Sequence, residues 1–112
     1  MSNLLTREEF KKQVFSKTNG KCCVPDCNCD AVDAHHIMDR KLFTDGGYYI
    51  GNGAALCTKH HLEAEKGMIT PLKCLHYMKL TFEECPIPDK IGLTKEEYFE
   101  LFCNGKLNKW GE

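Results

Sequence analysis

The sequence predicts a single α+β domain of 112 residues, in which a β-hairpin and the helix after it form a metal-stabilised core. Three observations support this prediction. Eight cysteines are many for so short a chain, and small domains often need a metal to complete a modest core. Two short segments joined by a glycine-containing turn are typical of a hairpin. Capping-box sequences predict helices on both sides of it.

The first helix is expected over residues 7–18. Thr6 and Glu9 have the spacing of a capping box, in which a hydroxyl and a carboxylate satisfy the first free amides of a helix. Asn19-Gly20 follows, and this pair readily adopts the left-handed conformation that ends helices. The N-terminal helix is therefore bounded by signals at both ends.

The hairpin is expected from residues 31–37 and 49–56, which form its two strands. Asp45-Gly46-Gly47 between them is a turn signal. Residues 57–66 have helical composition and complete the core. With the N-terminal helix, the core of the single domain spans about residues 7–67.

Residues 68–112 are expected to form a helical C-terminal extension. One helix opens at Thr70-Pro71, because Thr suits the N-cap and Pro suits the first turn. Its apolar side is expected to carry Leu72, Leu75, His76 and Met78. A second capping box, Thr94 to Glu97, begins another helix that ends before Asn104-Gly105.

Charge and hydropathy exclude two classes of function. Fifteen basic and 16 acidic residues give a net charge of −1. The overall charge of the chain therefore does not attract nucleic acid. A local patch, a bound cation or a partner protein would have to supply such affinity. No segment approaches the ~20 apolar residues of a membrane span, and no apolar stretch follows Met1. We therefore expect a cytoplasmic protein without a membrane partner, whose clustered Cys and His are metal ligands rather than disulfides.

The clustered cysteines predict a structural zinc site. Tetrahedral zinc usually takes two close pairs of Cys or His that the fold brings together. Cys57 and His60 form the later pair at the start of the core helix. The earlier pair is Cys27 with either Cys22 or Cys23, and we favour Cys22 because the longer loop accommodates the proline more easily.

Other cysteines leave alternatives open. Cys29 is a further option for the earlier pair, and all of these thiols could instead be merely reduced or buried. Cys74, Cys85 and Cys103 lie in apolar surroundings without a close partner, so we expect them to be small core residues.

Two histidine doublets exceed what one zinc site needs. His35 and His36 fall on the first predicted strand, where consecutive side chains point to opposite faces. His60 and His61 diverge by about a quarter turn or more on a helix. One histidine of the helical pair can therefore face zinc while the other faces a second site. The alternative is that His35 is itself a zinc ligand and His36 is exposed to solvent.

These residues, taken in order, resemble a known motif. Asp33-Ala34-His35-His36-Ile37, then Asn52, then Leu56-Cys57-Thr58-Lys59-His60-His61 is similar to the motif of the HNH endonucleases. His60 stands where that family most often has Cys. The resemblance covers about residues 7–67 and implies a ββα-metal core with a structural zinc, most like compact HNH proteins of phages and bacteria. The extension is not covered by it.

The resemblance implies a role for each matching residue. His36 would be the general base that activates water. His35 and His61 would bind a catalytic divalent cation such as Mg²⁺, Mn²⁺ or Ni²⁺. Asn52 would bond across the hairpin and fix the loop that aims His36. Glu65, one turn beyond His61, could supply a further ligand, and Asp33 could orient a neighbouring ligand.

The implied function is a metal-dependent endonuclease that hydrolyses phosphodiester bonds in nucleic acid, more often DNA, inside a bacterial cell or a phage-infected host. One site would cut one strand, and cutting both would need a dimer or two sequential nicks. Besides nucleic acid, the partners to expect are a second copy of the chain or a partner protein. The alternative is a non-catalytic zinc-binding module that binds nucleic acid or a partner protein. The intact His36 argues against that alternative, while the near-neutral charge favours it. A redox-sensing cysteine protein would not explain the histidines.

Overall fold

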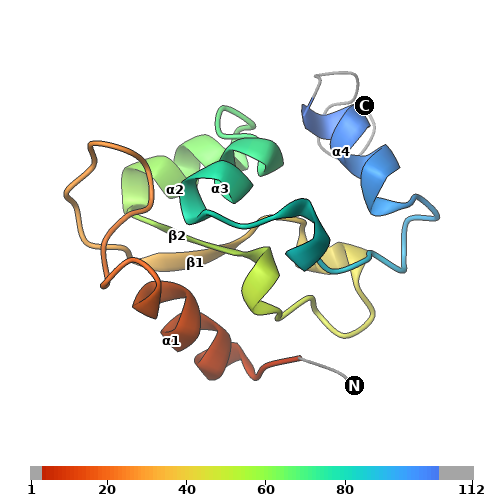
Figure 1. The fold of residues 1–112 in the computed structure, drawn as a ribbon, viewed down its shortest axis with the longest axis horizontal. Coiled ribbons are helices and arrows are strands. Elements are labelled where there is room, and N and C mark those ends of the chain that lie inside the picture. Colours follow the sequence, from red (N-terminus) through yellow and green to blue (C-terminus); the bar gives the residue numbers. More distant parts are fainter. Residues whose placement is uncertain (1–3, 104–112) are drawn as a thin grey trace.

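The computed structural model describes residues 4–103, and side chains as far as residue 100. At its centre lies a two-stranded antiparallel sheet. The first helix of the chain covers one face of this sheet, and the second and third helices cover the other face. The fourth helix packs on the third (Figure 1). The elements are α1 (Arg7–Ser16), β1 (Asp33–His36), β2 (Gly53–Leu56), α2 (Thr58–Glu65), α3 (Pro71–Met78) and α4 (Lys95–Cys103). The α+β class and the order of elements agree with the sequence prediction.

Helix capping occurs where the sequence predicts it. The Thr6 amide donates to Glu9 Oε1 at 3.0 Å, and the Glu9 amide donates to Thr6 Oγ1 at 3.1 Å. Thr94 and Glu97 make the same reciprocal pair before α4, at 2.8 and 3.1 Å. Thr70 caps α3 by accepting from the amide of the third helical residue.

Within the described residues, no helix has the length and apolar character that crossing a membrane requires.

Both strands are shorter than predicted. Residues Ile50–Asn52 form a turn of 3-10 helix, so the second strand begins only at Gly53. Ile37 lies beyond β1, although its amide still donates to the Asn52 carbonyl at 2.9 Å. Ile37 and Asn52 are both buried although they lie outside the strands. Burial at these positions therefore does not require that the strand pairing continues. Helix α1 likewise ends before the predicted limit.

The C-terminal extension packs with a different face from the predicted one. In α3 the buried residues are Cys74, Leu75 and Met78, which face β2 and α4. Leu72 is 56% exposed, and His76, one helical turn later, is exposed as well. The prediction was wrong for these two residues, because residues four apart share a helix face and this face meets solvent.

The extension also contacts the long loop between the strands. Asp89 Oδ1 accepts from the Thr44 amide at 2.9 Å, and Oδ2 accepts from the Thr44 hydroxyl at 2.7 Å. These bonds hold the pKa of the Asp89 carboxyl below its usual value. The Leu42 carbonyl accepts from the amides of Asp89 and Lys90. The extension therefore braces the loop that leads from β1 to β2.

Gly53 allows α1 to lie directly on the sheet, and this close approach generates a prediction. A Cβ at Gly53 would lie 2.3 Å from Val14 Cγ2 and 2.9 Å from Phe10 Cζ, both on buried side chains of α1. We expect Gly53→Ala to lower the free energy of unfolding by about 1–3 kcal/mol, measured by denaturant titration of zinc-loaded protein. Lys12→Ala, on the exposed side of α1, is the control and should change it by less than about 0.5 kcal/mol. Equal values for Gly53→Ala and wild type would contradict the close packing.

Candidate metal centres

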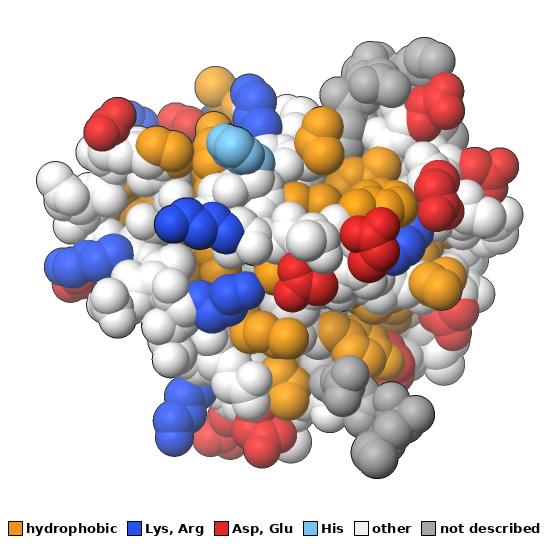
Figure 2. Space-filling model, in the orientation of Figure 1, with side chains coloured by type: hydrophobic (Ala, Val, Ile, Leu, Met, Phe, Trp, Pro, Cys, Tyr) orange, Lys and Arg blue, Asp and Glu red, His pale blue; other side chains and the backbone are white. Residues whose placement is uncertain are grey.

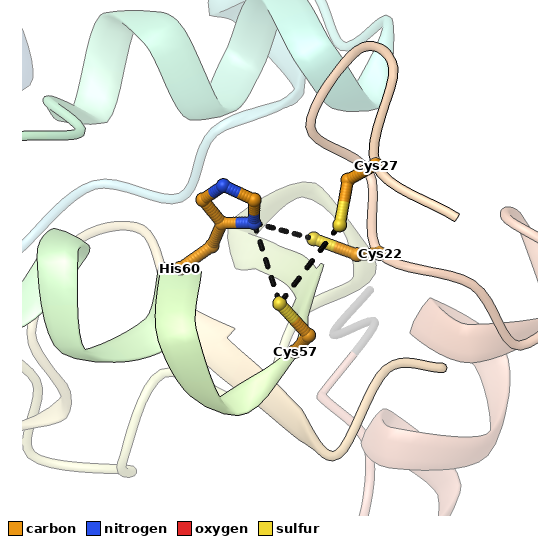
Figure 3. Close-up of side chains that lie close together, drawn as sticks. All are labelled: Cys22, Cys27, Cys57 and His60. Carbon is orange, nitrogen blue, oxygen red and sulfur yellow. Dashed lines mark hydrogen bonds between the residues drawn. The ribbon is translucent and has the colours of Figure 1, made fainter. Parts of the chain in front are cut away.

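Four side chains converge at the first turn of α2 (Figure 3). Cys22 and Cys27 come from the irregular loop after α1, Cys57 is the N-cap of α2, and His60 follows one turn later. Their ligand atoms all lie within 4.8 Å of one another. His60 Nδ1 is 3.4 Å from Cys22 Sγ and 3.3 Å from Cys57 Sγ. Cys27 Sγ is 4.0 Å from Cys57 Sγ.

These separations fit a tetrahedral metal. Zn–S bonds of about 2.3 Å and Zn–N bonds of about 2.0–2.1 Å place neighbouring ligand atoms roughly 3.5–3.8 Å apart. The three separations given above, 3.3–4.0 Å, bracket that range, and all of the ligand atoms lie within 4.8 Å of one another. The group of Cys22, Cys27, Cys57 and His60, called the Cys₃His cluster below, could therefore hold a metal such as zinc.

The loop that carries the first two ligands is closed at its base. Lys21 and Asp30 form an isolated β-bridge, and Lys21 Nζ lies 2.7 Å from Asp30 Oδ1. Inside this closure the Cys22 amide donates to the Cys29 carbonyl at 2.9 Å. Asp26 adopts the left-handed conformation, at a φ of 67°, which Asp tolerates better than most residues. At Asp26 the chain changes direction, and Cys27 therefore lies near the start of the loop.

The structure decides between Cys22 and Cys23. Cys22 belongs to the Cys₃His cluster, while the Cys23 amide donates to the Ala55 carbonyl at 2.8 Å and its thiol lies outside the cluster. Burial raises the pKa of the Cys23 thiol to about 12, so this thiol is protonated and unreactive near neutral pH. The structure thus brings the favoured Cys22, and not Cys23, into the group that could hold a metal, although both spacings are compatible with zinc.

The remaining cysteines do not join the cluster. Cys29 is exposed and is not one of the four clustered ligands, although its thiol interacts with Cys27 and Cys57, and the contact with Cys27 raises the pKa of the Cys29 thiol. Cys74 and Cys85 are buried in the core, as predicted. The side chain of Cys103 lies outside those that the structure describes.

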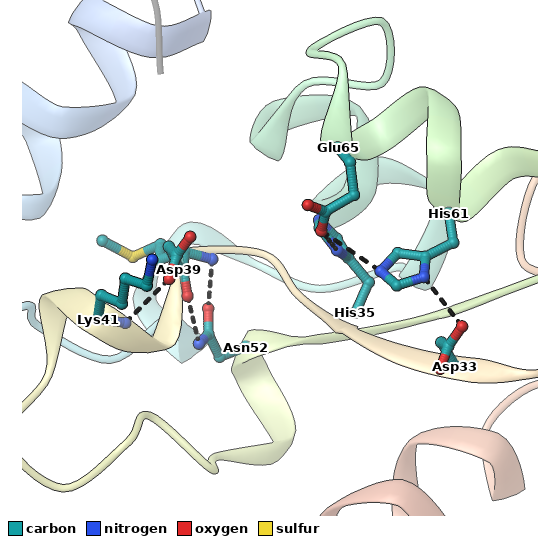
Figure 4. A network of polar contacts seen from close by, with 8 residues as sticks. Asp33, His35, Asp39, Lys41, Asn52, His61 and Glu65 are labelled. Atoms are coloured by element: carbon teal, nitrogen blue, oxygen red, sulfur yellow. Dashed lines mark hydrogen bonds and ion pairs between the residues drawn. The ribbon is translucent and has the colours of Figure 1, made fainter. Parts of the chain in front are cut away.

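A second group of ligand atoms lies on the same side of the sheet, between β1 and α2 (Figure 4). Glu65 Oε2 is 3.4 Å from His61 Nε2 and 3.7 Å from His35 Nδ1. The rings of His35 and His61 meet edge to face, with centroids 5.3 Å apart. The Glu65 side chain is 48% exposed and that of His35 only 13%, so the group opens to solvent at its Glu65 side. Three such donors with one side open could hold a metal ion and leave a position for a further ligand.

The histidine doublets divide as the sequence predicts. His60 faces the Cys₃His cluster and His61 faces the second group, which we call the His₂Glu cluster. His35 joins the His₂Glu cluster, so the alternative in which His35 binds the structural zinc is wrong. Glu65 belongs to the same cluster, because it lies one helical turn beyond His61.

His36 lies elsewhere. Its ring stacks on Phe10, with centroids 4.9 Å apart, and meets the Tyr48 ring edge-on at 5.0 Å. Consecutive strand residues face opposite sides, so the α1 face receives His36 while His35 faces α2. Among the described residues Nε2 has no hydrogen-bond partner and is shielded from solvent. Burial, followed by the nearby Arg40 charge, lowers the pKa of His36, while a backbone hydrogen bond with Gly46 opposes the shift.

This placement corrects one expectation. The alternative with His36 exposed to solvent is wrong, because its side chain is half-buried against two aromatic rings. The structure does not place His36 in the His₂Glu cluster. Two features of the sequence indicate this packing. Side chains on a strand alternate between the two faces of the sheet, and Phe10 lies on the buried side of the N-terminal helix.

Asn52 ties the long loop to the end of β1. It is fully buried, and its Oδ1 accepts from the Met38 amide at 2.8 Å. Its Nδ2 donates to the carbonyls of Met38 and Gly47, at 3.0 and 3.1 Å. Gly47 has a φ of +71°, and a Cβ there would lie 2.7 Å from the Phe43 ring, so glycine suits the position. Asn52 thus makes the cross-hairpin bonds that the resemblance implied, and it acts by fixing the loop.

The Cys₃His cluster generates a matched test of its ligands. We expect Cys22→Ser to lose zinc and most of its helical content, because the binding energy of a structural zinc is folding energy. Cys23→Ser removes the neighbouring thiol and should keep one zinc per chain with a native circular-dichroism spectrum. Metal content by mass spectrometry and far-ultraviolet circular dichroism check both. Zinc retained in Cys22→Ser but lost in Cys23→Ser would contradict this ligand set.

Comparison with known proteins gives no match. No protein-family model matches the chain, and neither a curated protein nor a solved structure does. The resemblance to the HNH endonucleases therefore rests on the motif residues in the sequence.

Proposed function

We propose that this protein is a metal-dependent endonuclease of the HNH type that hydrolyses phosphodiester bonds in nucleic acid, with DNA as the expected substrate. The observation that carries this proposal is the open His₂Glu cluster next to the Cys₃His cluster. Both clusters take ligands from the short helix α2. His60 and His61 are consecutive in α2, so a metal held by the first would fix the position of the second. A rigid scaffold beside an open cation site suits catalysis at a phosphate.

The donor set favours some cations over others. Two imidazoles and one carboxylate suit Mn²⁺, Ni²⁺, Zn²⁺ or Fe²⁺ better than Mg²⁺, which prefers oxygen ligands. His35, His61 and Glu65 would hold the ion. Bound there, it would neutralise charge on the scissile phosphate and stabilise the leaving oxygen. Mn²⁺ and Ni²⁺ are therefore expected to support cleavage at lower concentration than Mg²⁺.

In this proposal His36 acts as the general base. It accepts a proton from the water that attacks phosphorus, and the bond from phosphorus to the leaving oxygen breaks. The leaving oxygen takes a proton from solvent water, so the products are a phosphate monoester and a hydroxyl. A lowered pKa keeps the imidazole neutral near pH 7, which is the form that accepts a proton. His36 faces α1 whereas the His₂Glu cluster faces α2, and its Nε2 is shielded in the free protein, so in this proposal substrate binding must move His36 and expose Nε2 to the attacking water.

The surface charge supports a local nucleic-acid contact. On the face shown in Figure 2, Asp and Glu side chains gather mostly towards the side of the C-terminal extension, and Lys and Arg lie mostly towards the opposite side. A net charge of −1 therefore conceals an uneven distribution. Phosphate contacts position a nucleic acid through such local charges. One site cuts one strand, so cutting both would need a homodimer or a second nick.

One observation favours the second candidate, a zinc-binding module that binds nucleic acid or a partner protein without cleaving it. His36 packs between Phe10 and Tyr48 as a core aromatic residue would. Such packing gives His36 a structural reason to be present. The two predictions that follow separate these candidates.

The first prediction tests the His₂Glu cluster. Zinc-loaded protein should cleave DNA when Mn²⁺ or Ni²⁺ is added, and a mild chelator that spares the buried zinc should stop it. Glu65→Ala should cut the rate at low Mn²⁺ concentration by at least about tenfold, because metal affinity depends on each ligand. Glu63→Ala, on the same helix outside the cluster, is the control. Gel assays on single-stranded DNA, duplex DNA and RNA read the result, and no cleavage of any substrate with any ion would favour the binding module.

The second prediction separates the chemistry of His36 from its packing. His36→Phe keeps an aromatic ring against Phe10 and Tyr48 but removes both nitrogens, whereas His36→Ala would also open a gap in the packing. We expect His36→Phe to retain zinc and a native unfolding midpoint while cleavage falls by ~10²–10⁴-fold, as the loss of a general base predicts. Wild-type cleavage rates in a folded His36→Phe variant would show that His36 is a packing residue only.

A further inference from the structure

Asp33 connects β1 to α2 at the rim of the His₂Glu cluster. Its Oδ2 accepts a hydrogen bond from His61 Nδ1 at 2.9 Å (Figure 4). Asp33 precedes His35 by two residues on β1, so both side chains face α2. In the sheet register Asp33 is paired with Leu56, the residue directly before Cys57. Asp33 is thus held close to the turn of α2 that carries both metal clusters.

The hydrogen bond sets which nitrogen of His61 carries the proton. A neutral imidazole has one N–H, and a carboxylate at Nδ1 places it there, which leaves a lone pair on Nε2. That Nε2 lies 3.4 Å from Glu65 Oε2, which is also an acceptor. Two acceptors that face each other at this distance require a proton or a cation between them. A cation bound between Nε2 and Oε2 would satisfy both acceptors, and this geometry is what the proposal uses.

Folding stability does not explain the Asp33–His61 pair. The Asp33 side chain is 52% exposed and that of His61 is 27% exposed. Ion pairs and hydrogen bonds this close to solvent contribute little to the stability of a fold. Orientation of a metal ligand, by contrast, needs a fixed contact rather than a strong one.

We propose that Asp33 is a positioning residue for the cation of the His₂Glu cluster. It holds His61 as the Nδ1–H tautomer and directs Nε2 towards Glu65 and His35, so its loss weakens the cation site without emptying the Cys₃His cluster. This inference rests on the cation site of the proposed function. It assigns Asp33 no contact with the cation or with the substrate.

The tautomer of His61 is the first test, and it needs neither cation nor cleavage. Long-range ¹H–¹⁵N spectra of zinc-loaded protein at mildly alkaline pH distinguish the two tautomers. Wild type should show Nδ1–H at His61, and Asp33→Ala should shift His61 towards the Nε2–H form. Asp30→Ala is the control, because it removes an exposed carboxylate that pairs with Lys21 instead. An unchanged His61 tautomer in Asp33→Ala would overturn the proposal.

Cation affinity is the second test, measured by calorimetric titration of Mn²⁺ into zinc-loaded protein. We expect the Mn²⁺ dissociation constant to rise by about 10–100-fold in Asp33→Ala, as removal of such a supporting carboxylate typically does. Asp33→Asn, which keeps an acceptor oxygen without the charge, should give a smaller rise. Zinc content and the unfolding midpoint should match wild type, and cleavage should recover at high Mn²⁺ concentration.

These measurements separate this inference from the proposed function. If wild type binds Mn²⁺ through Glu65 and Asp33→Ala binds it more weakly, yet neither cleaves any nucleic acid, the positioning role stands and the nuclease proposal fails. A Mn²⁺ dissociation constant equal in wild type and Asp33→Ala overturns the positioning role even if both cleave DNA. Wild type that binds no Mn²⁺ at this cluster overturns both.

Discussion

The first turn of α2 is the constraint on which the functional part of this molecule depends. Cys57 caps the helix and His60 follows one turn later, and both belong to the Cys₃His cluster. His61 is the next residue, so its direction is fixed once His60 is held. A metal in the Cys₃His cluster would therefore do more than stabilise a small core, because it would also orient one ligand of the second cluster.

The strand opposite this helix divides the chemistry between two faces. His35 faces α2 and meets His61 and Glu65, whereas His36 faces α1 and packs on Phe10. The close approach of α1 depends on Gly53, which is paired with His36 across the sheet. The same backbone alternation thus supplies the His₂Glu cluster with one histidine and the packing against α1 with the other.

The loop between the strands is long, and three separate contacts hold it. Asn52, fully buried at the end of the loop next to β2, bonds to Met38 near the other end and to Gly47 within the loop. Asp89 of the extension accepts two hydrogen bonds from Thr44, and Gly51 approaches the Glu84 carbonyl so closely that a Cβ would lie 1.9 Å from that oxygen. The extension, which the HNH resemblance does not cover, is therefore packed against the hairpin loop rather than attached loosely beyond the core.

The sequence by itself determined the features that arise between near neighbours. The capping residues Thr6, Thr70 and Thr94 could be identified because a cap needs only residues about three apart. The pair Cys57 and His60, and the division of the histidine doublets, follow from helix and strand periodicity. Only the tertiary structure decided between Cys22 and Cys23, placed Glu65 beside His35, and packed His36 on Phe10. Each of these depends on how a loop closes or how a helix lies on the sheet, and such contacts between distant residues leave no periodic signal in one sequence.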